Sequence, residues 1–384
     1  MRFFYSLQDV PPFYDLLFKI FAFVLGACIG SFLNVCIYRM PLGLKVNEPK
    51  RSFCPACKYQ IPWHRNLPLF SWLALRGKCA NCGARISFRY FGVELLTALL
   101  FLAVWLKLTH WPLAEWGAAP WLLALPYFIL MGLLVVATFI DFEHFIIPDE
   151  ITWGGAIVGV LLSFAIPTLH GQQSALLGGA WSLAGAACGY FALWAVVELG
   201  KLAFGKKRIA FEQAEPFSWT RRGEEADFLM GEDKMLWSEF FVRGTEVLLM
   251  TCPEVEIGGQ RFENAQLRFT CDWLECGGKK FELVKTDAIR GAATEVTLPR
   301  EAMGFGDVKF IACIGAFLGW KAVFFTIMAA SVIGAVVGIF TLLVGRREWS
   351  AKIPFGPYLA LGALLWLFTG PELLAWYLRA ARGI

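Results

Sequence analysis

The stretch EAMGFGDVKFIACIGAFLGW, residues 301–320, places an ionisable carboxylate at the mouth of an apolar run that continues almost to Val344. The carboxylate is that of Asp307, and at the end of a membrane helix such a group either caps the helix or takes part in chemistry. Gly304 and Gly306 remove two side chains beside it, so backbone or an extended substrate can approach closely. The stretch therefore predicts a membrane helix with a candidate catalytic aspartate, provided that a second group acts with it.

The composition of the whole chain is that of a polytopic membrane protein. Of its 384 residues 57% are hydrophobic and 17% are charged, and the mean hydropathy is +0.56. Because about 20 apolar residues cross about 30 Å of hydrocarbon, we expect an all-α membrane domain with about eight spans. They lie at about 13–38, 90–107, 121–140, 152–169, 176–199, 308–318, 322–344 and 355–377, with a weak turn at 319–321 between the sixth and seventh.

The distribution of Lys and Arg predicts the orientation in the membrane. Residues 39–89 carry many basic side chains, whereas the loops 110–119 and 170–174 carry none. Since cytoplasmic loops are rich in Lys and Arg, we expect the N-terminus outside and residues 39–89 in the cytoplasm. Alternation then places the segment 141–150, the block 201–300 and the pair Arg346-Arg347 on the cytoplasmic side as well.

Four cysteines lie in the first cytoplasmic loop as two C-x2-C pairs separated by 21 residues: Cys54, Cys57, Cys79 and Cys82. The cytoplasm is reducing, which argues against two disulfides, and four thiolates suit tetrahedral zinc. Four protein ligands leave no position for water, so we expect a structural zinc ion rather than a catalytic one. The alternatives are four structural cysteines without a ligand, and a ligand role for His64 between the pairs.

Asp141 is the candidate partner of Asp307. It ends the third expected span, and the expected topology places both aspartates at the cytoplasmic edge of the membrane. Two carboxylates brought together share one proton, because like charges at close range cannot both ionise. One carboxylate then activates water while the other protonates the scissile group, which is aspartic-protease chemistry. The alternative for Asp307 is a helix cap, and Asp149, which follows Pro148, is expected to cap the fourth span.

Four motifs in this order resemble those of the bifunctional type IV prepilin peptidases, the GxGD aspartic proteases of type IV pilus and type II secretion systems. They are GSFLNVCIYRMP at 30–41, the cysteine loop with the helix after it at 54–101, IDFEHFIIPDEIT at 140–152 and GFGDVKF at 304–310. The resemblance covers both flanks of the chain and favours a catalytic role for Asp307 over a cap.

The resemblance implies two reactions at the bacterial inner membrane. A basic leader is removed from a type IV prepilin or pseudopilin after a glycine, and the new N-terminal residue is methylated on its amine with S-adenosylmethionine. Asp141 and Asp307 correspond to the catalytic dyad, and the four cysteines to zinc ligands. The implied partners are the prepilin and the lipid bilayer, without nucleic acid, and the oligomeric state is left open.

The methyltransferase site is less well marked, because the chain has no G-x-G-x-x-G after a strand. Asn34, Arg39 and Glu94 match family positions and are candidate cofactor-binding residues. A carboxylate in an apolar helix is costly without a role, so Glu94 is the candidate for orienting the substrate amine. The alternative is a structural ion pair between Arg39 and Glu94, or a similar pair. Lys309 matches the lysine after the second aspartate, where it would steady a charge or only reach the interface.

Residues 201–300 depart from the family pattern, in which the fifth span leads quickly to the second aspartate motif. Strand-like segments such as EVLLM, AQLRFTCDWL, KFELVKT and TEVTLP are separated by turns at Gly258-Gly259 and Gly277-Gly278. We therefore expect a small, mainly β cytoplasmic insertion domain, whose function is left open. The expected organisation is a methyltransferase-type region at 1–107 with its zinc loop at 39–89, a peptidase membrane core at 108–200 and 301–384, and the insertion at 201–300.

Two other functions stand as alternatives. A peptidase without methyltransferase activity is disfavoured, because family members reduced to the peptidase half typically lack the zinc-bearing loop. A membrane transporter, or a scaffold that binds partners through its zinc loop, is disfavoured because no internal repeat is visible and the acidic residues gather at one face.

Overall fold

The computed structural model describes most of the chain and divides it into two compact units. The described residues are 12–49, 52–110, 120–204, 206–222, 225–231, 233–237, 247–299, 304–344 and 354–381. One unit joins Met1–Ala195 to Met303–Ile384, and the other is Val196–Ala302. The loop at 111–119 and the pair Arg346-Arg347, both used above to predict the orientation, lie outside the described residues.

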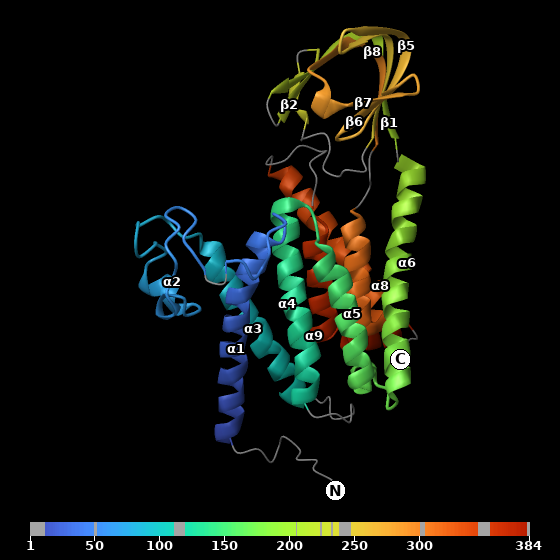
Figure 1. Cartoon of the computed structure of the whole chain (residues 1–384). Helices are drawn as coiled ribbons and strands as arrows, with labels where there is room; N and C mark the ends of the chain where they lie inside the picture. Colours follow the sequence, from blue (N-terminus) through green and yellow to red (C-terminus); the bar gives the residue numbers. More distant parts are fainter. Residues whose placement is uncertain are drawn as a thin grey trace. The chain divides into compact units, whose positions relative to one another are not determined.

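The first unit is a bundle of helices (Figure 1). Its long helices are α1 (Pro12–Arg39), α3 (Phe88–His110), α4 (Pro120–His144), α5 (Asp149–Ala165), α6 (Ala175–Phe204, whose last residues belong to the second unit), α8 (Phe305–Leu343) and α9 (Gly356–Ala381). The short α2 (Phe70–Ala74) and the 3-10 helix Trp63–Arg65 lie in the cysteine loop, and the 3-10 helix Pro167–His170 joins α5 to α6. Six of the long helices are long and apolar enough to cross a membrane, in agreement with the expected polytopic membrane protein.

The number of such helices differs from the roughly eight spans expected from the sequence. Helix α5, the expected fourth span, has only 17 residues, because Pro148 precedes it and Pro167 follows its end. The expected sixth and seventh spans both lie in the 39-residue segment α8, which consists of two helices joined at Gly319, where the backbone leaves the helical conformation with φ 79° and ψ 172°. Glycine tolerates such positive φ values, and a Cβ atom added at Gly315 would lie only 2.9 Å from Cγ2 of Val323, eight residues further on. A continuous helix would hold these residues about 12 Å apart, so the expected turn separates two helical parts of α8.

Glycines let the helices approach one another closely. A Cβ atom added at Gly30 of α1 would lie 2.8 Å from the Cα of Glu94 in α3, and one added at Gly185 of α6 would lie 2.2 Å from the carbonyl oxygen of Gly315 in α8. Neither distance leaves room for a side chain, so these backbones pack directly on each other. The first contact places Glu94 directly against α1.

The second unit contains an eight-stranded sheet with strand order β3-β2-β1-β8-β4-β5-β6-β7, in which every pair is antiparallel. Its strands are β1 (Lys206–Arg222), β2 (Glu225–Met230), β3 (Asp233–Leu236), β4 (Leu248–Ile257), β5 (Gln260–Phe269), β6 (Trp273–Cys276), β7 (Lys279–Glu282) and β8 (Ala288–Pro299). The strand-rich insertion expected from the sequence is thus confirmed. Its first and last strands pair with each other, and Lys206 lies opposite Pro299.

Two expected turns are found where the sequence places two glycines in succession. Gly258 and Gly259 link β4 to β5, Gly277 and Gly278 link β6 to β7, and all four have positive φ. Two-residue hairpin loops favour this backbone, which glycine adopts at little cost. The expected single strand at 265–274 is instead two strands, because the chain turns between β5 and β6.

Candidate active site and metal centre

The four cysteines of the first loop come together at one point. The ligand atoms of Cys54, Cys57, Cys79 and Cys82 all lie within 4.8 Å of one another, with 3.9 Å between the sulfurs of Cys54 and Cys82 and 4.0 Å between those of Cys57 and Cys79. Four sulfurs at about 2.3 Å from a tetrahedral zinc ion are about 3.8 Å apart, whereas a disulfide needs about 2.05 Å. The donor set and its spacing therefore fit zinc. His64 is exposed and does not belong to this cluster.

Each cysteine pair sits in a small hairpin. Antiparallel bridges join Phe53 to Gln60 and Lys78 to Arg85. In both hairpins the residue after the second cysteine has positive φ, namely 57° at Lys58 and 70° at Gly83. Its N–H donates to the carbonyl oxygen of the first cysteine, at 2.8 Å and 2.9 Å respectively. This tight turn brings both thiols of a pair to the same place, as the C-x2-C spacing predicts.

Hydrogen bonds favour the thiolate form of two of these cysteines. The backbone N–H of Tyr59 and then the side-chain amide of Asn81 lower the pKa of the Cys57 thiol to about 6. The backbone N–H groups of Cys82 and Asn81 lower the pKa of the Cys79 thiol. Because the thiolate is the form that binds a metal, these contacts prepare the two side chains for that role.

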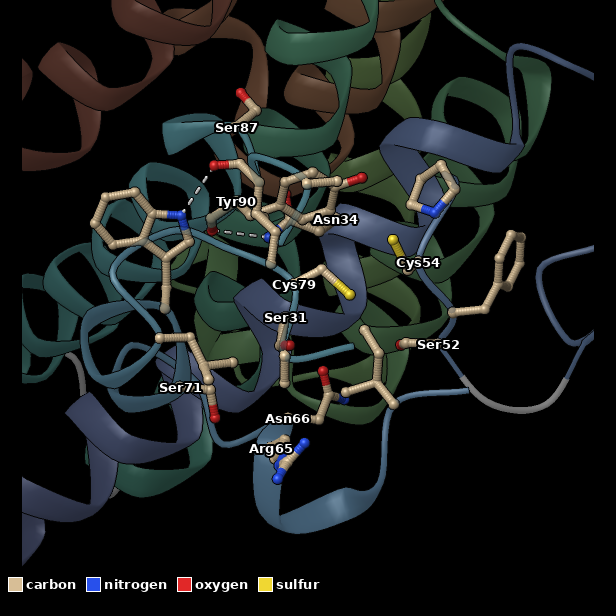
Figure 2. Close-up of a pocket in the computed structure, with 18 of the residues that line it drawn as sticks. Ser31, Asn34, Ser52, Cys54, Arg65, Asn66, Ser71, Cys79, Ser87 and Tyr90 are labelled. Atoms are coloured by element: carbon tan, nitrogen blue, oxygen red, sulfur yellow. Dashed lines mark hydrogen bonds between the residues drawn. The ribbon is translucent and has the colours of Figure 1, made fainter. Parts of the chain in front are cut away.

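A cavity of about 410 Å³ lies between the cysteine loop and the helices α1 and α3 (Figure 2). Cys54 and Cys79 belong to its wall, and so do Asn34, Arg39 and Glu94. The structure thus brings together the three residues that the family positions marked for the methyltransferase reaction, although they come from two helices. Aromatic side chains complete much of the lining, namely Tyr38, Phe53, Tyr59, Trp72 and Tyr90.

Glu94 and Arg39 both have partners in the cysteine loop. Glu94 is 9% exposed, and its Oε2 accepts a hydrogen bond of 2.7 Å from the N–H of Leu69. Arg39 is 5% exposed, and its Nη1 donates to the carbonyl oxygens of Val46 and Pro49 at 2.6 Å and 3.0 Å. Both side chains thus hold loop segments beside the helices, through partners other than the direct Arg39–Glu94 pair considered above.

Two polar atoms on the cavity wall are buried without a hydrogen-bond partner in the described part of the chain. They are Asn34 Oδ1 and Ser71 Oγ. The other side of the Asn34 amide is satisfied, because Nδ2 donates to the carbonyl oxygen of Tyr90 at 2.9 Å (Figure 2). A buried polar group without a partner costs about 1–3 kcal/mol. These two groups therefore carry a cost that no hydrogen bond in the described part of the chain offsets.

The two aspartates are buried in the helical unit. Asp141, near the C-terminal end of α4, is 5% exposed, and Asp307, in the first turn of α8, is 7% exposed. Asp141 Oδ2 accepts a hydrogen bond of 2.8 Å from the N–H of Gly356, the first residue of α9. Ile147 lies close to Gly356, which bonds Asp141, and close to Gly306, which precedes Asp307. A Cβ atom added at Gly356 would lie 3.0 Å from Ile147 Cδ1, and one added at Gly306 would lie 3.4 Å from Ile147 Cβ. Helices α4, α8 and α9 pack on one another around these groups.

Neither of the two aspartates considered as caps is an N-cap. Helix α8 has Gly304 as its N-cap, so Asp307 lies inside the first turn, and no side-chain cap hydrogen bond is formed. Helix α5 begins at Asp149, and its N-cap is Pro148, again without a side-chain cap. The expected cap at Asp149 is therefore wrong, because Pro148 takes that position. Asp149 instead pairs with Lys309 of α8 at 2.6 Å.

An ion pair that the sequence did not indicate joins α3 to α4. Arg89, at the start of α3, donates through Nη1 to both carboxylate oxygens of Glu143, near the end of α4. The side chain of Glu143 is 35% exposed and that of Arg89 20%. Glu143 lies two residues beyond Asp141, and Arg89 directly precedes Tyr90 of the cavity wall. The pair therefore connects the aspartate region with the cavity.

Comparison with known proteins adds to this geometry. Residues 24–108 match the bacterial peptidase A24 N-terminal domain, and residues 128–210 and 283–339 match the type IV leader peptidase family. A protein of Myxococcus xanthus (strain DK1622) named prepilin leader peptidase/N-methyltransferase is 31% identical over 375 residues, which cover 96% of this chain and 78% of the relative. The chain belongs to this family. The resemblance carried by the four sequence motifs is thereby confirmed.

Further relatives of the same name match over nearly their full length. That of Aeromonas hydrophila is 29% identical, with 93% of this chain and 92% of the relative covered. That of Pseudomonas aeruginosa is 28% identical, with 98% of each covered. No solved structure matches the chain. Both aspartates and all four cysteines lie in segments that match the family descriptions, whereas residues 211–282, which hold most of the inserted sheet, do not.

Proposed function

We propose that this chain removes the leader peptide from a type IV prepilin or pseudopilin, cutting after a glycine, and then methylates the new N-terminal amine. Family membership carries the proposal, since the relatives are named for both activities. Within the structure it is supported by two regions of one helical unit: a pair of buried aspartates, and a cavity bounded by the cysteine cluster.

In the peptidase reaction Asp141 and Asp307 act as a dyad that shares one proton. The unprotonated carboxylate takes a proton from water, whose oxygen attacks the carbonyl carbon of the glycine, while the other carboxyl group protonates the carbonyl oxygen. The C–N bond then breaks as the leaving amine takes the proton received from water. The hydroxyl proton of the intermediate returns to the second carboxylate, and the dyad is restored. The burial of both side chains supports this assignment, and so does the position of Ile147, which lies close to Gly356 beside Asp141 and close to Gly306, the residue before Asp307.

For the second reaction we assign the methyl donor to the cavity beside α1 and α3. S-adenosylmethionine supplies an electrophilic methyl group on a positively charged sulfur when it is bound. Asn34 and Ser71 supply polar groups to the lining of this cavity, and aromatic faces such as that of Trp72 favour a cation. Glu94 orients the amine of the cleaved pilin, and Arg39 holds the loop that closes one side of the cavity.

The four cysteines hold a structural zinc ion in this proposal. The fit of their sulfur spacing to a tetrahedral site supports it. Because Cys54 and Cys79 also line the cavity, the ion fixes one wall of the methyltransferase site. Residues 1–107 then form the methyltransferase-type region, and residues 108–200 and 301–384 the peptidase core.

The proposed location is the bacterial inner membrane, with the N-terminus outside. The basic loop at 39–89 supports this orientation, which places the zinc loop, the inserted sheet and the aspartates on the cytoplasmic side. Eight spanning segments result if α5 and the parts of α8 on either side of Gly319 each cross the bilayer. The substrate leader and the scissile bond then lie at the same membrane face as the dyad, and no nucleic acid is involved.

The test of this function compares wild-type membranes with Asp141→Asn and Asp307→Asn variants. Leader removal from a prepilin is followed on a gel, and transfer of labelled methyl groups to a pre-cleaved pilin is measured separately. Each substitution should abolish cleavage and leave methyl transfer intact. Asp149→Asn is the matched control, because this exposed aspartate pairs with Lys309 outside the proposed dyad.

Three outcomes separate the alternatives. Cleavage near the wild-type rate in either dyad variant would show that this aspartate is not catalytic. Cleavage without methyl transfer by the wild type would support the peptidase-only alternative. The absence of both activities with a panel of prepilins and pseudopilins would favour a transporter or scaffold.

A further inference from the structure

The N–H of Gly356 at the start of α9 is directed to a catalytic candidate rather than to its own helix. The first N–H groups of a helix have no partner inside it. In α9, Pro357 has no N–H, and those of Tyr358 and Leu359 both donate to the carbonyl oxygen of Phe355. The N–H of Gly356, which is buried, donates to Asp141 Oδ2 at 2.8 Å.

The missing side chain of Gly356 matters as much as its N–H. A Cβ atom at this position would lie 2.7 Å from Asp141 Oδ2, 3.2 Å from Asp141 Cγ and 3.0 Å from Ile147 Cδ1. Gly356 is not among the residues with positive φ, so its backbone conformation does not require glycine. The requirement comes from the close approach of the Asp141 carboxylate, which occupies the space that a side chain would fill.

We infer that Gly356 is a positioning residue for the peptidase reaction, because its N–H and its lack of a side chain together fix the carboxylate of Asp141. The inference rests on the proposed function. An N–H donates to a lone pair, so this hydrogen bond fixes the orientation of the Asp141 carboxyl group in the dyad.

The first experiment measures the kinetics of leader cleavage in a Gly356→Ala variant of the full chain in membranes. A displacement of about 1 Å of a reacting group can cost about 100-fold in rate, so kcat should fall about 100-fold while KM changes less than about twofold. A purely structural role would not separate kcat from KM in this way. Methyl transfer to pre-cleaved pilin reports the amount of folded protein in each variant.

Gly362→Ala is the matched control on the same helix. A Cβ atom there would lie 2.8 Å from the carbonyl oxygen of Thr326, a comparably tight contact that does not involve Asp141. Its kcat per folded molecule should stay within about threefold of wild type, since backbone packing alone is disturbed. If Gly362→Ala lowers kcat as far as Gly356→Ala does, packing of α9 explains both and the inference is overturned.

A second control separates the two atoms that the new Cβ would meet. Ile147→Val removes Cδ1 and relieves the contact with Ile147, but it leaves the contact with Asp141 Oδ2. Adding Ile147→Val to Gly356→Ala should therefore not restore kcat. Recovery of the wild-type value in this double variant would show that crowding of Ile147 was the cause, and would overturn the inference.

A third measurement applies if Gly356→Ala does not accumulate in membranes. Asp141→Ala deletes the carboxylate and makes room for the new Cβ, so the Gly356→Ala, Asp141→Ala double variant should accumulate to the level of Asp141→Ala alone. If the double variant accumulates as poorly as Gly356→Ala alone, the result contradicts the inference. Asp141→Asn keeps the two proposals apart: if it cleaves, the proposed function fails, and if it is inactive while Gly356→Ala is fully active, only this inference fails.

Discussion

The cysteine loop and the aspartate region are assembled over very different distances in the chain. The four cysteines lie in two neighbouring hairpins, and short backbone hydrogen bonds within each hairpin place the sulfurs. Asp141 and Asp307 come from α4 and α8, with the whole inserted sheet between them in the sequence, and α9 adds Gly356. A site built locally depends on its own ligands, whereas a site built from three helices depends on residues that carry no chemistry themselves.

One ion pair also joins the helices that carry the two regions. The Arg89–Glu143 pair joins the start of α3, beside the cavity, to the end of α4, beside Asp141. If the two regions carry separate reactions, a substitution in the cysteine loop should impair methyl transfer and leave cleavage largely intact. A substitution in the aspartate region should do the reverse. Damage to the connecting pair should affect both reactions, but weakly.

The largest separation of the two reactions should follow from Cys57→Ser. Structural zinc sites contribute directly to folding, so removing one of the four proposed ligands should weaken the site and the cavity wall formed by Cys54 and Cys79. We expect methyl transfer to pre-cleaved pilin to fall to background and cleavage to fall far less, with zinc content of the purified protein as a second readout. Cys271→Ser, at an exposed cysteine between β5 and β6, should change neither. Equal loss of cleavage and methyl transfer in Cys57→Ser would show that the two regions do not carry separate reactions.

A smaller but cleaner separation is expected for Glu94→Gln. The amide keeps an oxygen that can accept the N–H of Leu69, so the loop stays in place while the charge is lost. Methyl transfer should fall about 100-fold, as is typical for a group that orients or deprotonates a reacting amine, with cleavage within about twofold of wild type. Glu372→Gln, at a half-exposed glutamate paired with Lys107, is the control. Unchanged methyl transfer in Glu94→Gln would show that Glu94 only holds the cysteine loop through Leu69 and does not orient the amine.

The smallest effect should come from the connecting ion pair. Because both side chains are partly exposed, breaking it with Arg89→Ala costs about 1 kcal/mol, and both reactions should slow about fivefold. The reversed pair, Arg89→Glu with Glu143→Arg, should recover most of this loss. An effect on one reaction alone would show that the pair belongs to a single site and does not connect the two regions.

Local features were predictable because their chemistry depends on neighbours in the sequence. The two C-x2-C pairs indicated that four thiols come together, and the structure brings them together in two hairpins. The paired glycines at 258–259 and 277–278 indicated two hairpin turns, which are also present. The weak turn expected at 319–321 was found as well, because two helical parts of α8 meet at Gly319.

Features set by tertiary packing were not predictable in the same way. Gly356 lies in the string Pro-Phe-Gly-Pro at the start of an apolar run, which indicates a helix start but not which side chain its N–H will meet. The cap at Asp149 failed because Pro148 took that position and Lys309, distant in sequence, offered an ion pair. Strand β1 was missed because its register shifts between Ala210 and Glu215, which disturbs the alternation that marks a strand.

The pairing of Lys206 with Pro299 has a consequence for how this protein came to differ from shorter arrangements of the same family pattern. Opposite residues of an antiparallel pair are about 5 Å apart. The chain therefore enters and leaves the inserted sheet at neighbouring positions. A cassette with adjacent ends can be gained, exchanged or lost as a whole, because the gap that its removal leaves is spanned by one or two residues. The sheet can therefore be gained or lost during evolution without a change at Asp141 or Asp307.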